Sequence, residues 1–327
     1  MKMVTTTIYR VAILFVMMLP GIIMKKCKLC SDTFGKGLSN LVLYIAQPAL
    51  VFTAYLRDFD SKILLNSLFV LAMSIVAHLI FMVVTTVAFK RAPDMARRML
   101  TFATVFSNAA FMGMPLVLAV LGGEAMMYAS IYNITFNLFL WSFGVHVCTE
   151  RRDENRNGVS DDFEFHGGSP IIKALVHPVT LAAALGLVFF ILPINGYIPS
   201  LITDSLDMLA NLVAPLSMFV IGLRLPDVNL EGFIRDKFMY VFLILRHLAL
   251  PLTIIGIMFL LSLSGIAIDP RAYKVIALMT AAPAATSATM FAEKFDCDAA
   301  YVSRLVVVST LLSIGTMPLM IYVADFL

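Results

Sequence analysis

Long apolar runs alternate with short polar segments along the whole chain. Ten runs can be distinguished, at about residues 5–25, 36–56, 63–89, 98–121, 124–148, 172–193, 203–223, 238–263, 272–293 and 299–324. Most of them contain the ~20 residues that a helix needs to cross ~30 Å of hydrocarbon. The pattern therefore predicts an all-α polytopic membrane protein with ten transmembrane helices.

The composition agrees with a chain that lies in a lipid bilayer. Of the 327 residues, 60% are apolar and 14% are charged, and the mean hydropathy is +0.91. A soluble domain of this length would need more polar side chains to cover its surface. The net charge of +3, without a basic patch that contains aromatic residues, gives no reason to expect nucleic acid as a partner.

The distribution of basic residues predicts the orientation of the chain. The loops after the odd-numbered runs carry 17 Lys and Arg residues, and the segments on the opposite side carry 6. Because cytoplasmic loops are enriched in Lys and Arg, both termini are expected outside the cytoplasm. We expect a multi-pass protein of the plasma (cell inner) membrane.

A polar segment at residues 150–170, expected to be a cytoplasmic loop, divides the chain into residues 1–149 and residues 171–327. Each part holds five runs, and since five is odd, the second part must enter the membrane from the opposite side. A repeat between them would be inverted. Residues 38–57 align without gaps with residues 205–224, although prolines in such segments are also common in unrelated membrane helices.

Polar residues interrupt the fourth and ninth runs. Ser107 and Asn108 interrupt the fourth run, and Pro283, Thr286 and Ser287 interrupt the ninth. Each interruption lies roughly ten residues, or about 15 Å, into its run, close to the bilayer midplane. Two helices broken at corresponding places in two halves indicate the binding site of a secondary transporter. Kinked helices whose Ser and Thr bond to their own backbone are the alternative, but the matched depth favours a binding site. Helix breaks are expected at four prolines: Pro48, Pro115, Pro215 and Pro283.

Four further polar residues within the runs are candidates for the same site. Arg246 lies deep in the eighth run, where it could pair with a substrate carboxylate, pair with a helix C-terminus, or extend to the membrane surface. Its neighbour His247 is expected to be a packed core residue. Asn133 and Asn137 share a helix face and could line the site or bond between helices. Gln47, beside the first of the four prolines, could face the site from the second run.

Acidic residues and catalytic motifs are absent from the centres of the runs. A cation site at the midplane would need carboxylates, whereas helix N-termini suit an anion. The Cys27-x-x-Cys30 pair lacks the second ligand pair of a zinc site. No phosphate-binding loop and no hydrolase motif are present, so we expect no enzymatic activity, no catalytic residue, no cofactor and no metal site.

The chain resembles the auxin efflux carrier family, from about residue 8 to residue 324. The resemblance is carried by residues 41–52, 107–116, 282–284 and 309–313 and by the segment from Arg246 to Pro251. It implies ten helices in two inverted five-helix repeats. If the helix formed by each run is called a span and keeps the number of that run, spans 1, 2, 6 and 7 would form a scaffold. Spans 3–5 and 8–10 would form a transport unit in which the broken spans 4 and 9 cross.

The resemblance also implies a function, namely the transport of a small organic anion such as a carboxylate by a homodimer, with elevator-type alternating access. The polar loop is shorter than in many plant members, and Asn108 is not followed directly by Pro. Auxin itself is therefore not implied as the substrate. Two alternatives stay open: a sodium-coupled symporter of the bile-acid type with similar architecture, and a receptor or sensor that does not transport.

Overall fold

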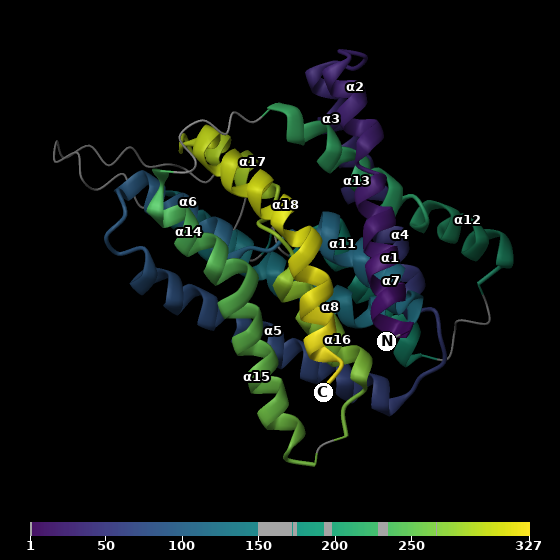
Figure 1. The fold of residues 1–327 in the computed structure, drawn as a ribbon. Helices are drawn as coiled ribbons and strands as arrows, with labels where there is room; N and C mark the ends of the chain where they lie inside the picture. Colours follow the sequence, from purple (N-terminus) through teal and green to yellow (C-terminus); the bar gives the residue numbers. More distant parts are fainter. Residues whose placement is uncertain (1, 150–171, 173–174, 193–197, 228–234, 266) are drawn as a thin grey trace.

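The structure, a computed structural model, is a bundle of α-helices (Figure 1). It describes residues 2–149, 172, 175–192, 198–227, 235–265 and 267–327. The predicted polar loop at residues 150–170 lies outside the described residues. The described residues contain no strand, but a single isolated bridge joins Ser107 and Ala284.

Among the described residues, seven helices are long and apolar enough to cross a membrane. They coincide with seven of the ten predicted runs, so an all-helical fold with seven candidate membrane spans is confirmed. The seven are Ile8–Lys26, Thr33–Tyr55, Ser61–Ala88, Gly123–Thr149, Ser200–Arg224, Lys237–Ser262 and Ala299–Ala324.

The other three runs form shorter helices. The fourth run is split into α6 (Asp94–Val105) and the helix Ala109–Leu121, which consists of the π-helical turn η2 (Ala109–Gly113) and α7 (Met114–Leu121). The sixth run forms α11 (Pro178–Ile191). The ninth run is split into α16 (Pro270–Ala281) and α17 (Ser287–Lys294). The fourth and ninth runs are thus both interrupted where the sequence predicted a break.

Of the long helices, α5 (Ser61–Ala88) and α18 (Ala299–Ala324) are uninterrupted. The others consist of segments that follow one another directly or after a short turn. These segments are α1 (Lys2–Val16) and α2 (Leu19–Lys26); α3 (Asp32–Leu41), η1 (Val42–Ala46) and α4 (Gln47–Tyr55); η3 (Gly123–Ala125), α8 (Met126–Phe139), η4 (Leu140–Gly144) and α9 (Val145–Thr149); α12 (Ser200–Ala210) and α13 (Val213–Arg224); α14 (Lys237–Ile244), η9 (Leu245–Ala249) and α15 (Leu250–Ser262).

The prolines affect these helices in different ways. Pro48, Pro115 and Pro251 are each the second residue of the α-helical segment that follows a π-helical turn. Because proline has no N–H, a carbonyl one turn earlier loses its partner, and the wider turn shifts the bonding register. These helices are widened there without ending. Pro215 follows a turn at residues 211–212. Of the four prolines predicted to break helices, only Pro283 lies in a segment that separates two helices.

Two close helix contacts involve glycine. A Cβ on Gly222 of α13 would lie 2.1 Å from the carbonyl oxygen of Met18, and a Cβ on Gly21 of α2 would lie 2.4 Å from that of Phe219. A Cβ on Gly186 of α11 would lie 2.9 Å from the side chain of Tyr55 in α4. Small residues let membrane helices approach this closely. The first span therefore packs against the seventh, and the sixth against the second.

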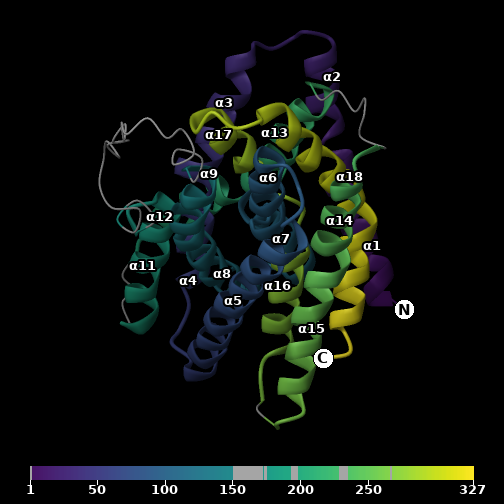
Figure 2. The ribbon, with the colours of Figure 1, turned by 90° about the vertical axis from the view of Figure 1, so that its left-hand side faces the viewer.

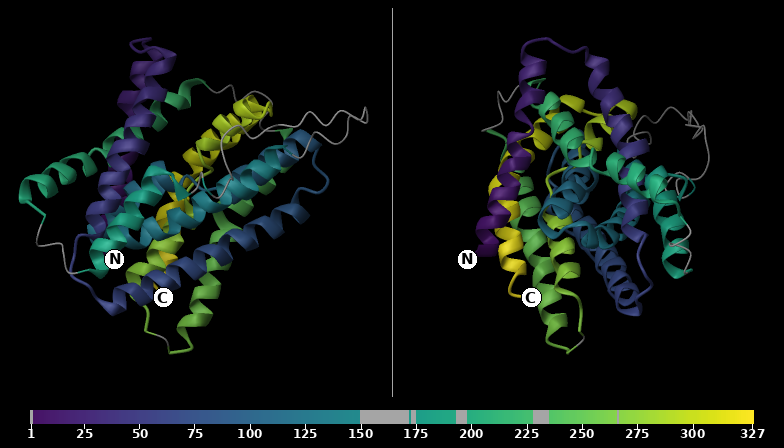
Figure 3. Two further views of the ribbon diagram at one scale, coloured as in Figure 1. Left: turned by 180° about the vertical axis from the view of Figure 1, so that it is seen from behind. Right: turned by 90° about the vertical axis from the view of Figure 1, so that its right-hand side faces the viewer.

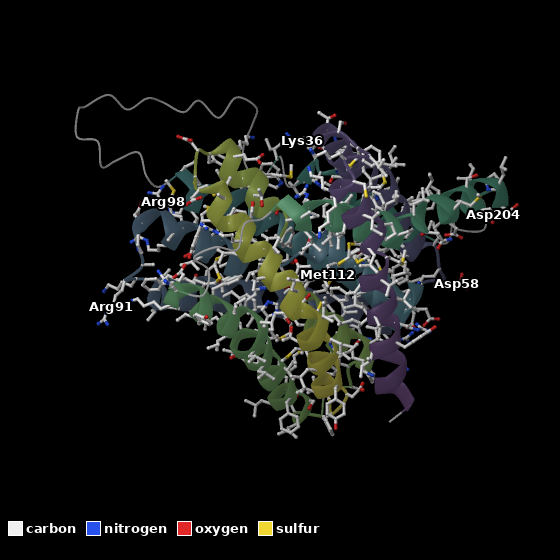
Figure 4. The ribbon with its side chains drawn as sticks, turned by 45° about the horizontal axis from the view of Figure 1, so that its top comes forward. Lys36, Asp58, Arg91, Arg98, Met112 and Asp204 are labelled. Atoms are coloured by element: carbon white, nitrogen blue, oxygen red, sulfur yellow. The ribbon has the colours of Figure 1, made fainter. Side chains whose placement is uncertain are left out.

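Both chain ends lie at the same end of the bundle (Figures 1 and 3), as an even number of crossings requires. In Figure 4, Arg91 and Arg98 lie at one side of the molecule, and Asp58 and Asp204 lie at the opposite side. In Figure 2, α6, α7 and α16 occupy the middle of the bundle. The two interrupted runs are therefore central in the fold.

Candidate functional site

The interruptions of the fourth and ninth runs are hydrogen-bonded to each other. The amide of Asn108 donates to the carbonyl of Pro283 at 2.7 Å, and the amide of Ala285 donates to the carbonyl of Phe106 at 2.9 Å. These two bonds flank the antiparallel bridge between Ser107 and Ala284. The predicted breaks are thus adjacent in space, although they are far apart in the sequence.

The local sequence explains the ninth-run break better than the fourth. A proline disfavours the helical conformation of the residue before it, and Ala282, directly before Pro283, has ψ 146°. The fourth-run break contains no proline. There, Phe106 has φ −96° and ψ 113°, and Asn108 precedes the first residue of η2. Asn is favoured at such a starting position, but the extended backbone is also stabilised by the bridge to the other break.

Each interruption creates a helix C-terminus and a helix N-terminus. The C-termini are those of α6 and α16, and the N-termini are those of η2 and α17. The first N–H groups of a helix have no partner within it, and the helix end carries roughly half a positive charge. The carbonyls at a C-terminus carry roughly half a negative charge. Four helix ends, two of each sign, therefore lie within a few residues of the bridge.

Arg246 binds the two C-termini. Its Nε donates to the carbonyl of Ala282 at 3.0 Å, its Nη1 to that of Thr104 at 2.9 Å, and its Nη2 to that of Thr280 at 3.0 Å. The side chain is fully buried, and its Cζ lies 5.6 Å from the centre of the Phe81 ring. Of the three predicted alternatives, the structure has the pairing with helix C-termini. The side chain does not extend to the membrane surface.

His247, next to Arg246 in η9, is linked to the ninth-run break by hydrogen bonds through Ser309. Its Nε2 lies 2.8 Å from the hydroxyl of Ser309, and that hydroxyl accepts the amide of Ala284 at 2.9 Å. Its Nδ1 lies 3.0 Å from the hydroxyl of Thr316. His247 is buried as predicted. This link could not be predicted from the sequence, because Ser309 and Thr316 lie in a different helix.

Several candidate side chains around the breaks have buried polar atoms without a hydrogen-bond partner. Gln47 of α4 donates from Nε2 to the carbonyl of Ala110 in η2 at 2.5 Å. Among the described residues, five of the buried polar atoms without a partner belong to the candidate side chains: Gln47 Oε1, Ser107 Oγ, Asn108 Nδ2, Asn133 Oδ1 and Ser287 Oγ. Leaving such a group unpaired costs roughly 1–3 kcal/mol. A bound molecule with both donors and acceptors would satisfy them.

The remaining candidates lie near these groups or further away. Thr286 is buried directly before α17, and its carbonyl accepts from Nη1 of Arg224 at 3.2 Å. The hydroxyl of Ser107 lies near that of Tyr132, the neighbour of Asn133 in α8. Asn137 is buried one turn further along α8, and its side chain bonds to neither break. The structure therefore brings Gln47 and Arg246 to the breaks that contain Ser107, Asn108, Thr286 and Ser287. Asn133 and Asn137 are buried in α8, and their part in the site stays a prediction.

Few charged side chains are buried in the structure. No Asp or Glu side chain is buried among the described residues, and the buried cationic side chains there are Arg98 and Arg246. Arg98 lies near the start of α6, where it pairs with Asp94 at 2.9 Å. In the part of the chain that the structure describes, no three His, Cys, Asp or Glu side chains could hold a metal ion together. The arrangement suits a small molecule that interacts with helix N-termini and uncharged polar groups.

Comparison with known proteins agrees with this description. Residues 6–321 match the profile of a family described as "Membrane transport protein". A protein of Methanothermobacter thermautotrophicus named as an uncharacterized transporter is 28% identical over 306 residues, which are 93% of this chain and 94% of that protein. Another uncharacterized transporter, of Methanocaldococcus jannaschii, is 25% identical over 228 residues, 68% of this chain and 70% of that protein.

Proposed function

The chain belongs to the membrane transport protein family, the auxin efflux carrier family, and from this premise we propose that it is a secondary transporter of a small carboxylate. The observation that carries the proposal is the pairing of two broken helices, which brings two helix N-termini to buried, unpartnered polar atoms. Helix N-termini attract carboxylates. No carboxylate is buried among the described residues, and such a side chain would be needed to hold a sodium ion there by charge.

An inverted repeat is supported by the two glycine contacts. In the alignment of residues 38–57 with residues 205–224, Tyr55 is equivalent to Gly222. The first span packs through Gly21 at Gly222, and the sixth span packs through Gly186 at Tyr55. The contact between the first and seventh spans thus corresponds to the contact between the sixth and second spans. Two inverted halves would produce such a pair of equivalent contacts. Spans 1, 2, 6 and 7 would form the scaffold.

Elevator-type movement is supported by the way the breaks are bonded. Arg246, His247 and Ser309 bond the two breaks to spans 8 and 10. Spans 4, 8, 9 and 10 are thus joined within the proposed transport unit of spans 3–5 and 8–10. At the breaks, single bonds from Gln47 and Arg224 connect this unit to spans 2 and 7. The proposed cycle exchanges such bonds while the bridge between the breaks stays intact.

The remaining features of the proposal concern the whole protein. It lies in the plasma membrane with both termini outside the cytoplasm, which accords with the distribution of basic residues and with the two chain ends at one end of the bundle. It forms a homodimer through spans 2 and 7. Native mass measurement in a mild detergent tests the dimer, and a monomeric mass would contradict it.

Uptake into proteoliposomes tests the proposed function. The purified protein is reconstituted and offered radiolabelled acetate, lactate, malonate and succinate, with and without a sodium gradient. We expect at least one of these carboxylates to be taken up, and the uptake to be independent of sodium. Uptake that requires sodium would support the symporter of the bile-acid type. Saturable binding without any uptake would support a receptor or sensor.

A further inference from the structure

Each of the three nitrogens of the Arg246 guanidinium already donates a hydrogen bond in the structure. The Nε and Nη2 edge of the guanidinium binds the carbonyls of Ala282 and Thr280, and Nη1 binds that of Thr104. A carboxylate that pairs with arginine in the usual two-bond manner needs two neighbouring donors along one edge. Because Phe81 also lies against the guanidinium, Arg246 offers no such edge to a substrate.

The charge of Arg246 matches that of the helix ends it binds. The C-termini of α6 and α16 together carry about one negative charge, and one guanidinium balances it. The N-termini of η2 and α17 together carry about one positive charge, for which the described residues provide no buried carboxylate. The uncompensated charge at the crossing therefore lies at the N-termini.

We propose that Arg246 is a positioning residue that holds the two broken helices together and neutralises their C-termini, so that the substrate's negative charge meets the two N-termini and not Arg246. The inference rests on the proposed transport function and names the part of the site that recognises charge. Arginine is required because its planar group donates in several fixed directions, whereas the ammonium of lysine is a single centre. A lysine at this position would keep the charge but could not reach both C-termini.

The bridge between the breaks provides a measurement that needs no substrate. Ser107 and Ala284 lie directly opposite each other in the antiparallel bridge, and no backbone hydrogen bond joins these two residues. In such a non-hydrogen-bonded pair the Cα atoms lie about 4.5 Å apart. Cysteines at such a distance can form a disulfide. The variant S107C/A284C, with the natural cysteines 27, 30, 148 and 297 replaced by Ser, should therefore cross-link under a mild oxidant such as copper phenanthroline.

The test compares this cross-linking rate in three backgrounds. Arg246→Lys should slow the reaction by about tenfold, because bonds from a charged group to the C-termini are lost. Arg271→Lys serves as the matched control, since Arg271 is partly exposed and pairs with Glu124 at the protein surface, and its rate should not change. If Arg246→Lys does not insert into the membrane, Phe81→Leu replaces it, with an expected slowing of about threefold.

Transport kinetics separate positioning from substrate binding. With the panel carboxylate that the unmodified protein takes up fastest, Arg246→Lys should lower Vmax by about tenfold and change KM by less than about threefold. An unchanged cross-linking rate would overturn the inference, as would a KM that rises by tenfold or more at an unchanged Vmax. If no panel member is transported, the proposed function fails, but the cross-linking comparison still decides the role of Arg246 in holding the breaks.

Discussion

At the scale of single residues, the site depends on side chains that offer hydrogen bonds without charge. Asn108 lies directly beside the bridge, and its Nδ2 is buried without a partner. Gln47 and Asn133 add unpartnered acceptors from two other helices. A carboxylate with a hydroxyl group or another donor would satisfy both kinds of atom. The polarity of the site therefore comes from amide groups, and its charge from the backbone.

Asn108→Ala should weaken the binding of a transported carboxylate by roughly ten- to hundredfold, because a donor to a charged group is lost. Membrane insertion should be unaffected, since the side chain's Nδ2 makes no bond within the protein. Isothermal titration or thermal shift with the panel carboxylates measures the effect. The control is Asn40→Ala, at an exposed position, which should bind like the unmodified protein. Equal binding by both variants would remove Asn108 from the site.

Some residue roles could be predicted from the sequence and others could not. Asn108 and Pro283 were identifiable because a polar or proline residue deep in an apolar run is rare and lies at a definable depth. The partners of Arg246 were not, because they are backbone carbonyls 34, 36 and 142 positions away, and every residue has a carbonyl. The link from His247 to Ser309 was missed because Ser309 lies 62 positions away in a different helix.

At the scale of elements, the proposed site depends on where the helices end, and not on how many helices there are. The runs were predictable because hydropathy alone determines whether a segment of this length can span the bilayer. The widened turns before Pro48 and Pro115 were not predicted, since both were expected to break their helices. A register shift within a helix leaves the apolar pattern almost unchanged, so only the structure distinguishes a widened turn from a break.

Pro283→Ala should lower transport strongly while some binding survives. The substitution turns residues 281–285 into an uninterrupted alanine segment, and alanine has the highest helix propensity, so α16 can extend and the N-terminus of α17 is lost. Initial rates of uptake and equilibrium binding are measured side by side. Pro318→Ala is the control, because Pro318 lies within the continuous helix α18. Transport at the unmodified rate in Pro283→Ala would show that the break is not required.

Gly222→Ala should destabilise the protein, because a Cβ there would overlap the carbonyl oxygen of Met18. Such overpacking typically costs about 1–3 kcal/mol. Gly256→Ala is the matched control: Gly256 also lies in a helix, but no atom lies within 4 Å of its added Cβ. Thermal unfolding in detergent should show a lower midpoint for Gly222→Ala alone. Equal midpoints for both variants would contradict the close packing of the first and seventh spans.

At the scale of the whole molecule, two inverted five-helix halves cross the membrane an even number of times, so both chain ends must lie on one side. The basic residues predict that this side is outside the cytoplasm. A reporter that is active only in the cytoplasm, such as green fluorescent protein, is fused after Leu327 and should be inactive. The same reporter inserted after Arg91, in a predicted cytoplasmic loop, is the positive control. Activity at both positions would refute the proposed orientation.

In the proposed transporter, one carboxylate binds where the two broken helices meet. This binding is tested by the alkylation of Ala110→Cys in η2 and Ser287→Cys in α17, both half-buried positions, with the natural cysteines replaced by Ser. A transported carboxylate should slow the alkylation of both cysteines with the same concentration dependence. Its neutral amide should have no effect on either, and a cysteine at exposed Asn40 should react equally in all conditions. If the carboxylate protects neither position while it is still transported, the site does not lie at the two breaks.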